Sequence, residues 1–321
     1  MDKWLALVLS SWVFWVYLDN CFSGMKIFFI VNPVAGRRKN PKRLINLIRK
    51  VCREAGAEFA IRIWEHPDQI SELVDAAKMG NYDRVVAVGG DGTVNAIGKL
   101  LIDTDIAMGI VASGSGNGFA HHLGFSKKMS VAIQQNLEGR IEKVDTGIFG
   151  GFPFLNSAGI GMDAEVVEKF HGKKSRGLRT YIRLSTQTLL KFRSFPVSVD
   201  IDGSKMFWKR VYFVDIANGT EWGNGAKISP KSRITDGSMT SIVVPRTLIT
   251  RVPKMLNQLF NGRLDRNKNV KMIPGKKFTI NRDNAGVAHI DGDPVYLPAE
   301  IECEIRPFSL FVVVPPLKTA V

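Results

Sequence analysis

Apolar runs alternate with amphipathic segments through the first third of the chain. The runs expected to be strands are 26–31, 58–64, 84–88 and 106–112, and the segments expected to be helices are 41–54, 68–79 and 93–101. In 41–54 the apolar residues recur at helical spacing. Buried strands that alternate with helices form parallel βαβ units. Residues 25–140 are therefore expected to form a Rossmann-like α/β domain.

The pattern changes near residue 141 to strand candidates separated by turns. The expected strands are 142–149, 152–158, 195–202, 207–217, 238–244, 277–282 and 300–306, with helical interruptions near 163–192 and 247–261. This pattern indicates a mainly antiparallel β domain over residues 141–307. The apolar run 308–314 is expected to pack back on the first domain, so 308–321 is treated as a separate C-terminal segment.

The first 24 residues form a hydrophobic leader ahead of this pattern. Residues 4–18 carry no charge, but they are fewer than the roughly 20 apolar residues that a transmembrane helix needs. Three interpretations stay open: the core of a signal peptide, a membrane anchor, or a start codon placed too far upstream. We favour the last because the folded pattern begins immediately at Met25.

Composition and charge narrow the class of protein. The hydrophobic content of 45% is that of a chain with a sizeable core, which excludes a largely disordered protein. The net charge of +14 indicates an anionic partner, such as nucleic acid, a phosphate-rich cofactor or an acidic membrane surface. The three cysteines are far apart and form no CxxC pair, which excludes a disulfide scaffold and indicates a reducing, cytosolic compartment.

Three glycine-rich turns follow expected strands of the first domain, at 32–36, 89–95 and 113–118. The carboxyl ends of parallel strands meet at one edge of a sheet, so these turns should converge on one crevice. Glycine lets backbone amides approach phosphate oxygens, and a helix starting at Thr93 would direct its positive dipole to the same place. The crevice suits a nucleoside triphosphate, although the chain has neither a Walker motif nor the protein-kinase HRD motif.

Several motifs in a fixed order carry a resemblance to a known family. VNPVAG, VVAVGGDGTVNAI, GSGN, KVDTG, FLNSAGIGMDAEV, TDGSM and HIDGDP together resemble the diacylglycerol kinase catalytic domain family, which includes bacterial lipid kinases, sphingosine kinases and ceramide kinases. The resemblance runs from Met25 to about Pro315. It implies an α/β nucleotide-binding domain related to NAD kinases and phosphofructokinases, followed by an antiparallel β-sandwich, with ATP and a lipid headgroup meeting between them.

The resemblance also implies an ATP site in the first domain. Its residues would be Asn32, Pro33, Val34, Ala35, Gly36, Gly89, Gly90, Asp91, Gly92, Thr93, Val94, Asn95, Ser115 and Asn117. Asp91 is expected to act in catalysis near the metal or the phosphates. Asn117 has a second interpretation, because an asparagine at this position could cap the next helix.

The acidic residues of the second domain are implied to serve catalysis. Asp293 is the expected general base, joined to Asp145 and Asp236 through a metal–water network, since a carboxylate within hydrogen-bond reach can remove a hydroxyl proton. Backbone carbonyls of Arg233 and Ser238, with the Asp236 side chain, would hold a structural magnesium. The family usually has glutamate where this chain has Asp293, and the shorter side chain reaches about one bond less far. Alternatively, the DGD sequence is only a hairpin turn.

Two departures from the family leave the acceptor open. The GSGN loop is similar to that of sphingosine kinases, whereas many bacterial diacylglycerol kinases carry an Asn-Asp pair there. Trp64, Glu65 and His66 stand where such enzymes often place a threonine that contacts adenosine. Diacylglycerol is the default acceptor, and a sphingoid base or ceramide is the alternative.

Basic residues cluster at 37–39, at 42–43 and through 169–193. They could dock the protein on an anionic membrane, or they could form a solvated basic face. His121 and His122 resemble a metal pair only in sequence, because adjacent helical side chains point in different directions. We interpret both as surface or cleft residues.

The sequence therefore predicts an ATP- and magnesium-dependent lipid kinase, cytoplasmic and peripherally bound to the inner face of the membrane. A soluble acceptor, as in NAD kinases, is a weaker hypothesis because FLNSAGIG and TDGSM favour the lipid-kinase family. A non-catalytic, nucleotide-dependent regulatory protein is a further alternative. No RNA-binding motif accompanies the positive charge, so nucleic acid is not an expected partner. A homodimer stays open.

Overall fold

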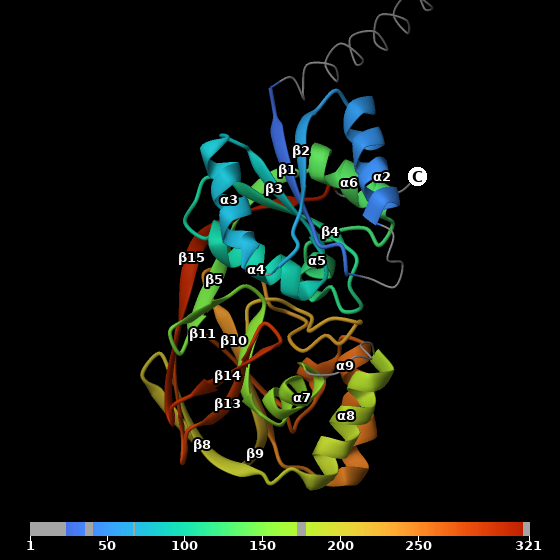
Figure 1. The fold of residues 1–321 in the computed structure, drawn as a ribbon. Coiled ribbons are helices and arrows are strands. Elements are labelled where there is room, and N and C mark those ends of the chain that lie inside the picture. Colours follow the sequence, from blue (N-terminus) through green and yellow to red (C-terminus); the bar gives the residue numbers. More distant parts are fainter. Residues whose placement is uncertain (1–23, 36–40, 67, 172–177, 317–321) are drawn as a thin grey trace, which may run out of the picture.

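The computed structural model describes residues 24–35, 41–66, 68–171 and 178–316 (Figure 1). The first domain is a parallel sheet with the strand order β4-β3-β1-β2. Its strands are β1 (Lys26–Val31), β2 (Glu58–Ile63), β3 (Arg84–Gly89) and β4 (Ala107–Ala112), and its helices are α2 (Pro41–Glu54), α3 (Gln69–Met79), α4 (Asp91–Leu101), α5 (Gly118–His122) and α6 (Met129–Glu138). This arrangement confirms the α/β domain predicted from the alternating pattern.

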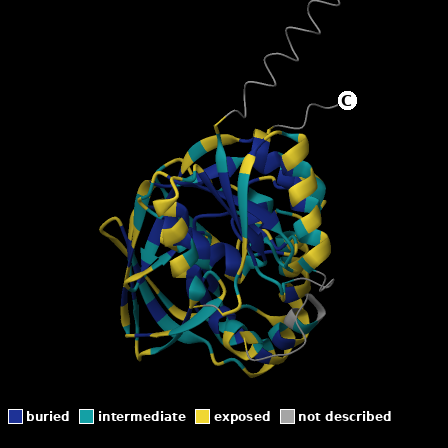
Figure 2. Cartoon of the chain, turned by 45° about the horizontal axis from the view of Figure 1, so that its top comes forward, coloured by how far each residue is buried: buried dark blue, intermediate teal, exposed yellow. Residues whose placement is uncertain are grey.

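Helices cover both faces of this sheet because its strands are apolar on both sides. In β1, Ile27 and Phe29 belong to the core cluster that contains α2 and α6. Phe28 and Ile30, which point to the opposite face, belong to the cluster that contains α3 and α4. Successive strand residues alternate between faces, so a continuous apolar run needs a helical layer on each side. Figure 2 shows the resulting buried sheet between partly exposed helices.

The second domain is an antiparallel sheet with three helices on one side (Figure 1). Its strands are β5 (Arg140–Phe149), β6 (Phe152–Phe154), β7 (Ser157–Gly161), β8 (Phe195–Ile201), β9 (Ser204–Ala217), β10 (Met239–Pro245), β11 (Lys271–Gly275), β12 (Lys277–Arg282), β13 (Gly286–Ile290), β14 (Asp293–Leu297) and β15 (Glu300–Val314). Its helices are α7 (Met162–His171), α8 (Leu178–Lys191) and α9 (Val252–Phe260), and it has short 3-10 turns at η1 (Ile249–Arg251) and η2 (Leu264–Arg266).

One long strand joins the two domains. β15 pairs antiparallel with β12 and β5, and Val312 pairs in parallel with Met108 of β4. The register shifts between Arg306 and Leu310, where Phe308 has a left-handed φ of 51°. β15 therefore crosses the boundary expected at residues 307–308, and the bulge lets one strand turn from one sheet direction to the other.

Short or interrupted elements differ from the sequence-based expectations. The span 152–158 divides into β6 and β7, and the described residues of the span 163–192 form α7 and α8. The helices α5 and α6 and the strands β11, β13 and β14 were not predicted. Each of these strands has five residues, and β14 carries Pro294 at its second position. Periodicity over so few residues is a weak signal, and an internal proline argues against a strand.

No helix within the described ranges is long and apolar enough to cross a membrane. Residues 1–23 of the leader, for which an anchor and a signal peptide were considered, lie outside the described residues.

Candidate functional site

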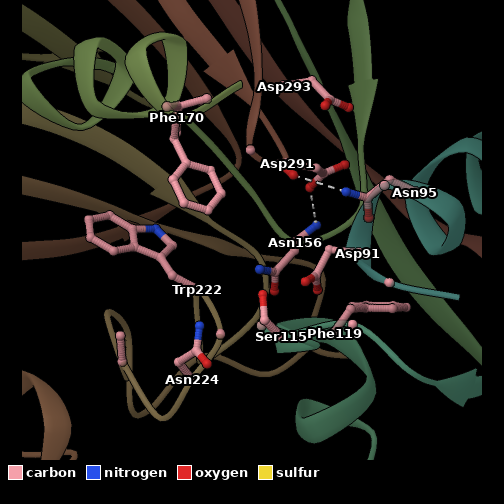
Figure 3. A pocket seen from close by; sticks show the side chains of 18 of the residues that line it. Asp91, Asn95, Ser115, Phe119, Asn156, Phe170, Trp222, Asn224, Asp291 and Asp293 are labelled. Carbon is pink, nitrogen blue, oxygen red and sulfur yellow. Dashed lines mark hydrogen bonds between the residues drawn. The ribbon is translucent and has the colours of Figure 1, made fainter. Parts of the chain in front are cut away.

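A cleft of about 2940 Å³ lies between the two domains. At one end it is lined by the loops 32–35, 90–93 and 113–116 of the first domain. At the other end it is lined by residues of α7, α8 and α9. Figure 3 shows the region between these ends, with Asp91 and Ser115 of the first domain opposite Asn156, Asp291 and Asp293 of the second.

The glycine-rich loops converge through direct backbone packing. A Cβ atom on Gly114 would lie 2.6 Å from the Cα of Gly90, so the two loops touch without side chains between them. Asn32 ties the first loop to this pair, because its Nδ2 donates to Oγ1 of Thr93 at 2.9 Å. Its Oδ1 accepts a hydrogen bond from the amide of Val34 at 3.0 Å. The three predicted turns thus form one edge of the cleft.

Asp91 holds the loop that precedes α5. Its Oδ2 accepts from the amide of Asn117 at 2.7 Å, and its Oδ1 accepts from the amide of Gly118 at 2.9 Å. Burial raises the pKa of the Asp91 carboxyl, and these two amides offset part of that rise. The Asn117 side chain makes no cap and donates instead to the carbonyl of Gly114. Asp91, rather than Asn117, therefore satisfies the first amides of α5.

Asp291 makes buried contacts with both domains, and it was not among the predicted site residues. Its carboxylate accepts from the backbone amides of residues 155–157 at 2.8 to 3.2 Å. The same carboxylate, with a fully buried side chain, lies 3.6 Å from Nζ of Lys99 in α4. Its own carbonyl accepts from Nδ2 of Asn95 at 2.9 Å. The one signal in the sequence was its place in the HIDGDP motif. In the structure it occupies a left-handed turn position with φ of 54°.

Asp293 lies two residues farther on and has a different environment. It begins β14, its side chain is 50% exposed, and it lines the cleft. Its Oδ1 is 4.0 Å from Nδ1 of His171 in α7. Of the two carboxylates in the motif, Asp291 is thus committed to backbone amides, whereas Asp293 faces the cleft (Figure 3).

Asp145 and Asp236 lie together on another part of the second domain. The buried carboxylate of Asp145 accepts from the amides of Gly237 at 2.8 Å and Phe308 at 2.9 Å. Burial raises the pKa of Asp145, and the nearby charge of Asp236 raises it further. Asp236 is exposed, and its Oδ1 accepts from the amide and hydroxyl of Ser238.

The structure separates the predicted site residues into two groups. The residues that line the cleft are Asn32, Pro33, Val34, Ala35, Gly90, Asp91, Gly92, Thr93, Asn95, Ser115 and Asp293. The described residues outside this lining are Gly89, Val94, Asn117, Asp145, Arg233, Asp236 and Ser238. Gly36 lies outside the described residues.

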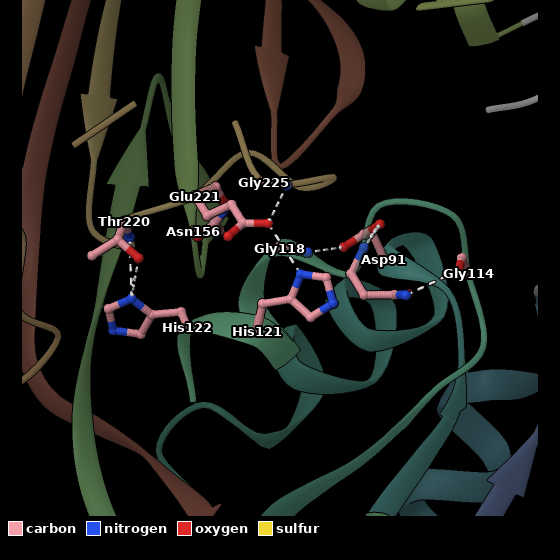
Figure 4. A network of polar contacts seen from close by, with 10 residues as sticks. Asp91, Gly114, Gly118, His121, His122, Asn156, Thr220, Glu221 and Gly225 are labelled. Carbon is pink, nitrogen blue, oxygen red and sulfur yellow. Dashed lines mark hydrogen bonds and ion pairs between the residues drawn. The ribbon is translucent and has the colours of Figure 1, made fainter. Parts of the chain in front are cut away.

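Two histidines of α5 contact the second domain beside this site (Figure 4). Nδ1 of His121 lies 3.0 Å from Oε1 of Glu221, which also accepts from the amide of Gly225 at 2.7 Å. Burial opposes ionisation of Glu221, but these partners outweigh it and lower its pKa. Nδ1 of His122 accepts from the amide of Thr220 at 3.2 Å. Both imidazoles therefore serve contacts between the domains and do not face each other as metal ligands would.

We expect acidification to weaken the His122 contact. Its Nδ1 accepts a hydrogen bond only when unprotonated, and burial lowers the pKa of His122 below its usual value near 6.5. The contribution to stability is therefore complete above about pH 6.5 and is lost as pH falls toward the lower folded-state pKa. Thermal unfolding at pH 7.5 and 5.0 should show a larger loss of Tm for the wild type than for His122→Asn.

The matched control for this experiment is His66→Asn, because His66 is exposed and lies in the first domain. This variant should lose as much Tm between the two pH values as the wild type does. An equal loss of Tm in the wild type and in His122→Asn would contradict the role given to His122.

A buried cluster of ionisable side chains borders the cleft. His289 of β13 pairs across the sheet with Gly159 of β7, which pairs in turn with Asp215 of β9. Because the central position has no side chain, Nε2 of His289 comes within 3.6 Å of Oδ1 of Asp215. Asp163 of α7 closes the cluster, with its Oδ2 3.1 Å from Nε2 of His289. A Cβ on Gly159 would lie 2.9 Å from both carboxylates, so glycine is required there.

Burial raises the pKa of Asp215 to about 7, although the charge of His289 opposes this rise. Burial disfavours the charged form of His289, but the hydrogen bond and charge of Asp163 outweigh it and raise its pKa. The three side chains offer ligand atoms close enough to hold a metal ion. Asp163 and His289 fall in the motifs FLNSAGIGMDAEV and HIDGDP, but the cluster could not be predicted, since its members come from three separate elements.

Comparisons with known proteins agree with this architecture. Residues 26–149 match the model of the diacylglycerol kinase catalytic domain, and residues 156–314 match that of the YegS C-terminal NAD kinase beta sandwich-like domain. A crystal structure of a diacylglycerol kinase from Bacillus anthracis (strain Sterne) has a TM-score of 0.70 at 19% identity, and the match covers 91% of this chain and 97% of that one. At this identity, the structural match shows the fold alone.

Curated relatives are similar over most of their length. The proteins named "Probable lipid kinase YegS-like" from Chromohalobacter salexigens and Yersinia pestis are each 27% identical to this chain. The matches cover 76% and 80% of this chain and 80% and 90% of the respective relatives. The uncharacterized protein sll0036 of a Synechocystis strain is also 27% identical, over 88% of this chain and 69% of its own length.

Proposed function

Because the chain belongs to the lipid kinases that join a diacylglycerol kinase catalytic domain to a YegS C-terminal domain, we propose that its acceptor is diacylglycerol. Membership of a kinase family implies ATP as the phosphoryl donor. The proposed reaction transfers the γ-phosphoryl group to the acceptor hydroxyl, forming phosphatidic acid and ADP. The hydroxyl proton leaves with a base on the enzyme.

The observation that carries this proposal is the chemical contrast between the two ends of the cleft. Glycine-rich loops line one end, whereas the other end is lined by apolar side chains from the helices, strands and loops of the second domain. These include Val166, Phe170, Leu189, Phe213, Ile228, Val244, Val252, Met255 and Leu259. Phosphates suit the first surface and acyl chains the second. A wholly polar, soluble acceptor would leave the apolar end without a partner.

Asp293 is the group we assign as general base. It lines the cleft between the two ends, and its side chain is half exposed, so the carboxylate can be reached from the cleft. A carboxylate in this position can accept the hydroxyl proton as the phosphoryl group is transferred. Asp91 is assigned to phosphate positioning, because it holds the loop before α5 at the edge of the cleft. The remaining cleft-lining loop residues are assigned to ATP.

Magnesium is proposed at two places. With ATP, Mg²⁺ neutralises charge on the phosphates. A structural Mg²⁺ would be held by the Asp236 side chain and the carbonyls of Arg233 and Ser238, with Asp145 behind it. The donor set fits a hard cation, because all three proposed ligands are oxygen atoms and one of them carries a negative charge.

Radiolabel transfer from γ-labelled ATP in the presence of Mg²⁺ tests the proposal. Diacylglycerol, sphingosine and ceramide are supplied separately in mixed micelles, and NAD serves as the soluble acceptor. We expect label in phosphatidic acid. Label only in a phosphorylated sphingolipid would replace the proposed acceptor by the sphingoid alternative. ATP binding without any labelled product would favour the non-catalytic regulatory protein.

A further inference from the structure

The two helices at the apolar end of the cleft expose apolar side chains to solvent. The exposed residues are Ile182, Leu190, Leu248, Ile249, Leu256 and Phe260, and they belong to α8, to α9 and to the turn before α9. We name this surface the α8–α9 face. All of these residues except Leu248 also line the cleft. Leu248 is 64% exposed and lies outside that lining, so the substrate cavity does not account for its exposure.

The inner sides of the same helices are also apolar. Leu189 of α8 and Met255 and Leu259 of α9 pack against the core cluster that contains Phe213. Ordinary surface helices are apolar on one side only. Leu248 directly precedes Ile249 of the cleft lining, so the apolar surface of the cleft continues onto the outside of the protein, as it does at an interaction site.

The charged residues in the two segments that form this face are all basic. Residues 178–193 contain four basic residues and no acidic residue, and residues 246–264 also contain four basic residues and no acidic residue. Among the described side chains, those exposed are Arg183, Lys191, Arg193, Arg246, Arg251, Lys254 and Arg263. The whole chain has 44 basic and 30 acidic residues, so an absence of acidic residues from both segments is a local feature.

We propose that the α8–α9 face docks on an anionic bilayer, with the turn at Leu248 and Ile249 in the interface and the basic side chains on the lipid headgroups. Exposed apolar residues flanked by basic residues of one sign match an interface of acyl chains beneath negative headgroups. Docking in this orientation opens the apolar end of the cleft toward the lipid that is phosphorylated. The assignment rests on the proposed function, because only a membrane acceptor requires this approach.

Flotation of the full chain with vesicles tests the docking face. The vesicles contain either phosphatidylcholine alone or phosphatidylcholine with phosphatidylglycerol, and neither ATP nor acceptor is added. We expect binding to the anionic vesicles that decreases with salt. Two variants, Leu248→Gln and Arg251→Glu/Lys254→Glu, should each bind about tenfold more weakly. The matched controls are Met79→Gln on α3 and Arg49→Glu/Arg53→Glu on α2, which should bind as the wild type does.

Several results would overturn the inference. Equal binding to neutral and anionic vesicles, or a loss of binding in the α2 control alone, would show that another surface docks. If vesicles are not bound and Leu248→Gln separates a dimer seen by sedimentation, a second copy of the chain covers this face instead. Thermal unfolding of each variant checks that the fold is intact, and the substituted side chains are all exposed.

Different results would contradict the docking inference and the proposed function. Arg251→Glu/Lys254→Glu should phosphorylate the acceptor normally in detergent micelles, because neither residue lines the cleft, and should lose activity on vesicles. If no lipid is phosphorylated in either format but anionic vesicles are bound through this face, the docking inference stands and the proposed function fails. If micellar lipid is phosphorylated and the variants bind vesicles as the wild type does, only the docking inference fails.

Discussion

Replacing Asp293 with asparagine is expected to lower the rate of phosphoryl transfer by about 100- to 10,000-fold. The amide keeps the shape of the side chain but cannot accept the hydroxyl proton, so the chemical step loses its base. Stability should change by less than about 0.5 kcal/mol, because the side chain is half exposed. The measurement is kcat with saturating ATP and acceptor, beside a thermal melt of each protein.

Asp293→Glu is the matched variant for this prediction. It restores the carboxylate that the family usually has at this position and lengthens its reach by one bond. We expect activity of the same order as the wild type. If Asp293→Asn retains full activity, the base is another group, and the half-exposed carboxylate then has no role in the chemistry.

Replacing Asp291 with asparagine is expected to lower the free energy of unfolding by about 2–4 kcal/mol. The carboxylate accepts from the amides of residues 155–157 and lies beside Lys99, with its side chain fully buried. In the variant, the side-chain amide would direct its N–H donors at a backbone N–H or at the Lys99 ammonium and leave buried groups unpaired. Urea unfolding followed by circular dichroism measures the loss.

The control for Asp291 is Asp283→Asn, which removes the same charge from an exposed loop before β13. It should change stability by no more than about 0.5 kcal/mol. A similar loss of stability in both variants would mean that net charge, rather than the buried hydrogen bonds, accounts for the effect. Asparagine tolerates the left-handed backbone at residue 291, so strain does not confuse the comparison.

The predicted convergence of the three glycine-rich turns is seen in the structure, because its signal is local in the sequence. The loops 32–35, 90–93 and 113–116 each follow a strand, and the shared carboxyl edge of a parallel sheet brings them to one cleft. Their glycines also indicate the close packing that is seen between Gly90 and Gly114. Backbone geometry at such turns depends mainly on neighbouring residues, so motifs are sufficient to locate them.

The division of roles within the HIDGDP motif could not be predicted in the same way. Asp291 and Asp293 are two residues apart in one hairpin, and the sequence does not show which carboxylate turns inward. The answer depends on the amides of residues 155–157, which lie at the turn between β6 and the start of β7, more than 130 positions earlier in the chain. The DGD sequence can thus be a hairpin turn and also supply a catalytic carboxylate, because the turn between β13 and β14 places Asp293 at the cleft.

Sequence alone determined the alternation of strands and helices at the start of the first domain, the α/β and β halves, and the glycine-rich turns at the strand ends, because each depends on hydrophobic periodicity or turn chemistry among near neighbours. Tertiary structure alone decided that Asp163, Asp215 and His289 meet over Gly159, that Asp145 and Asp236 lie apart from the cleft lining, and that a single strand, β15, pairs in both domains. These contacts join residues distant in the chain. Strand register and core packing select them, and neither is encoded in any single segment.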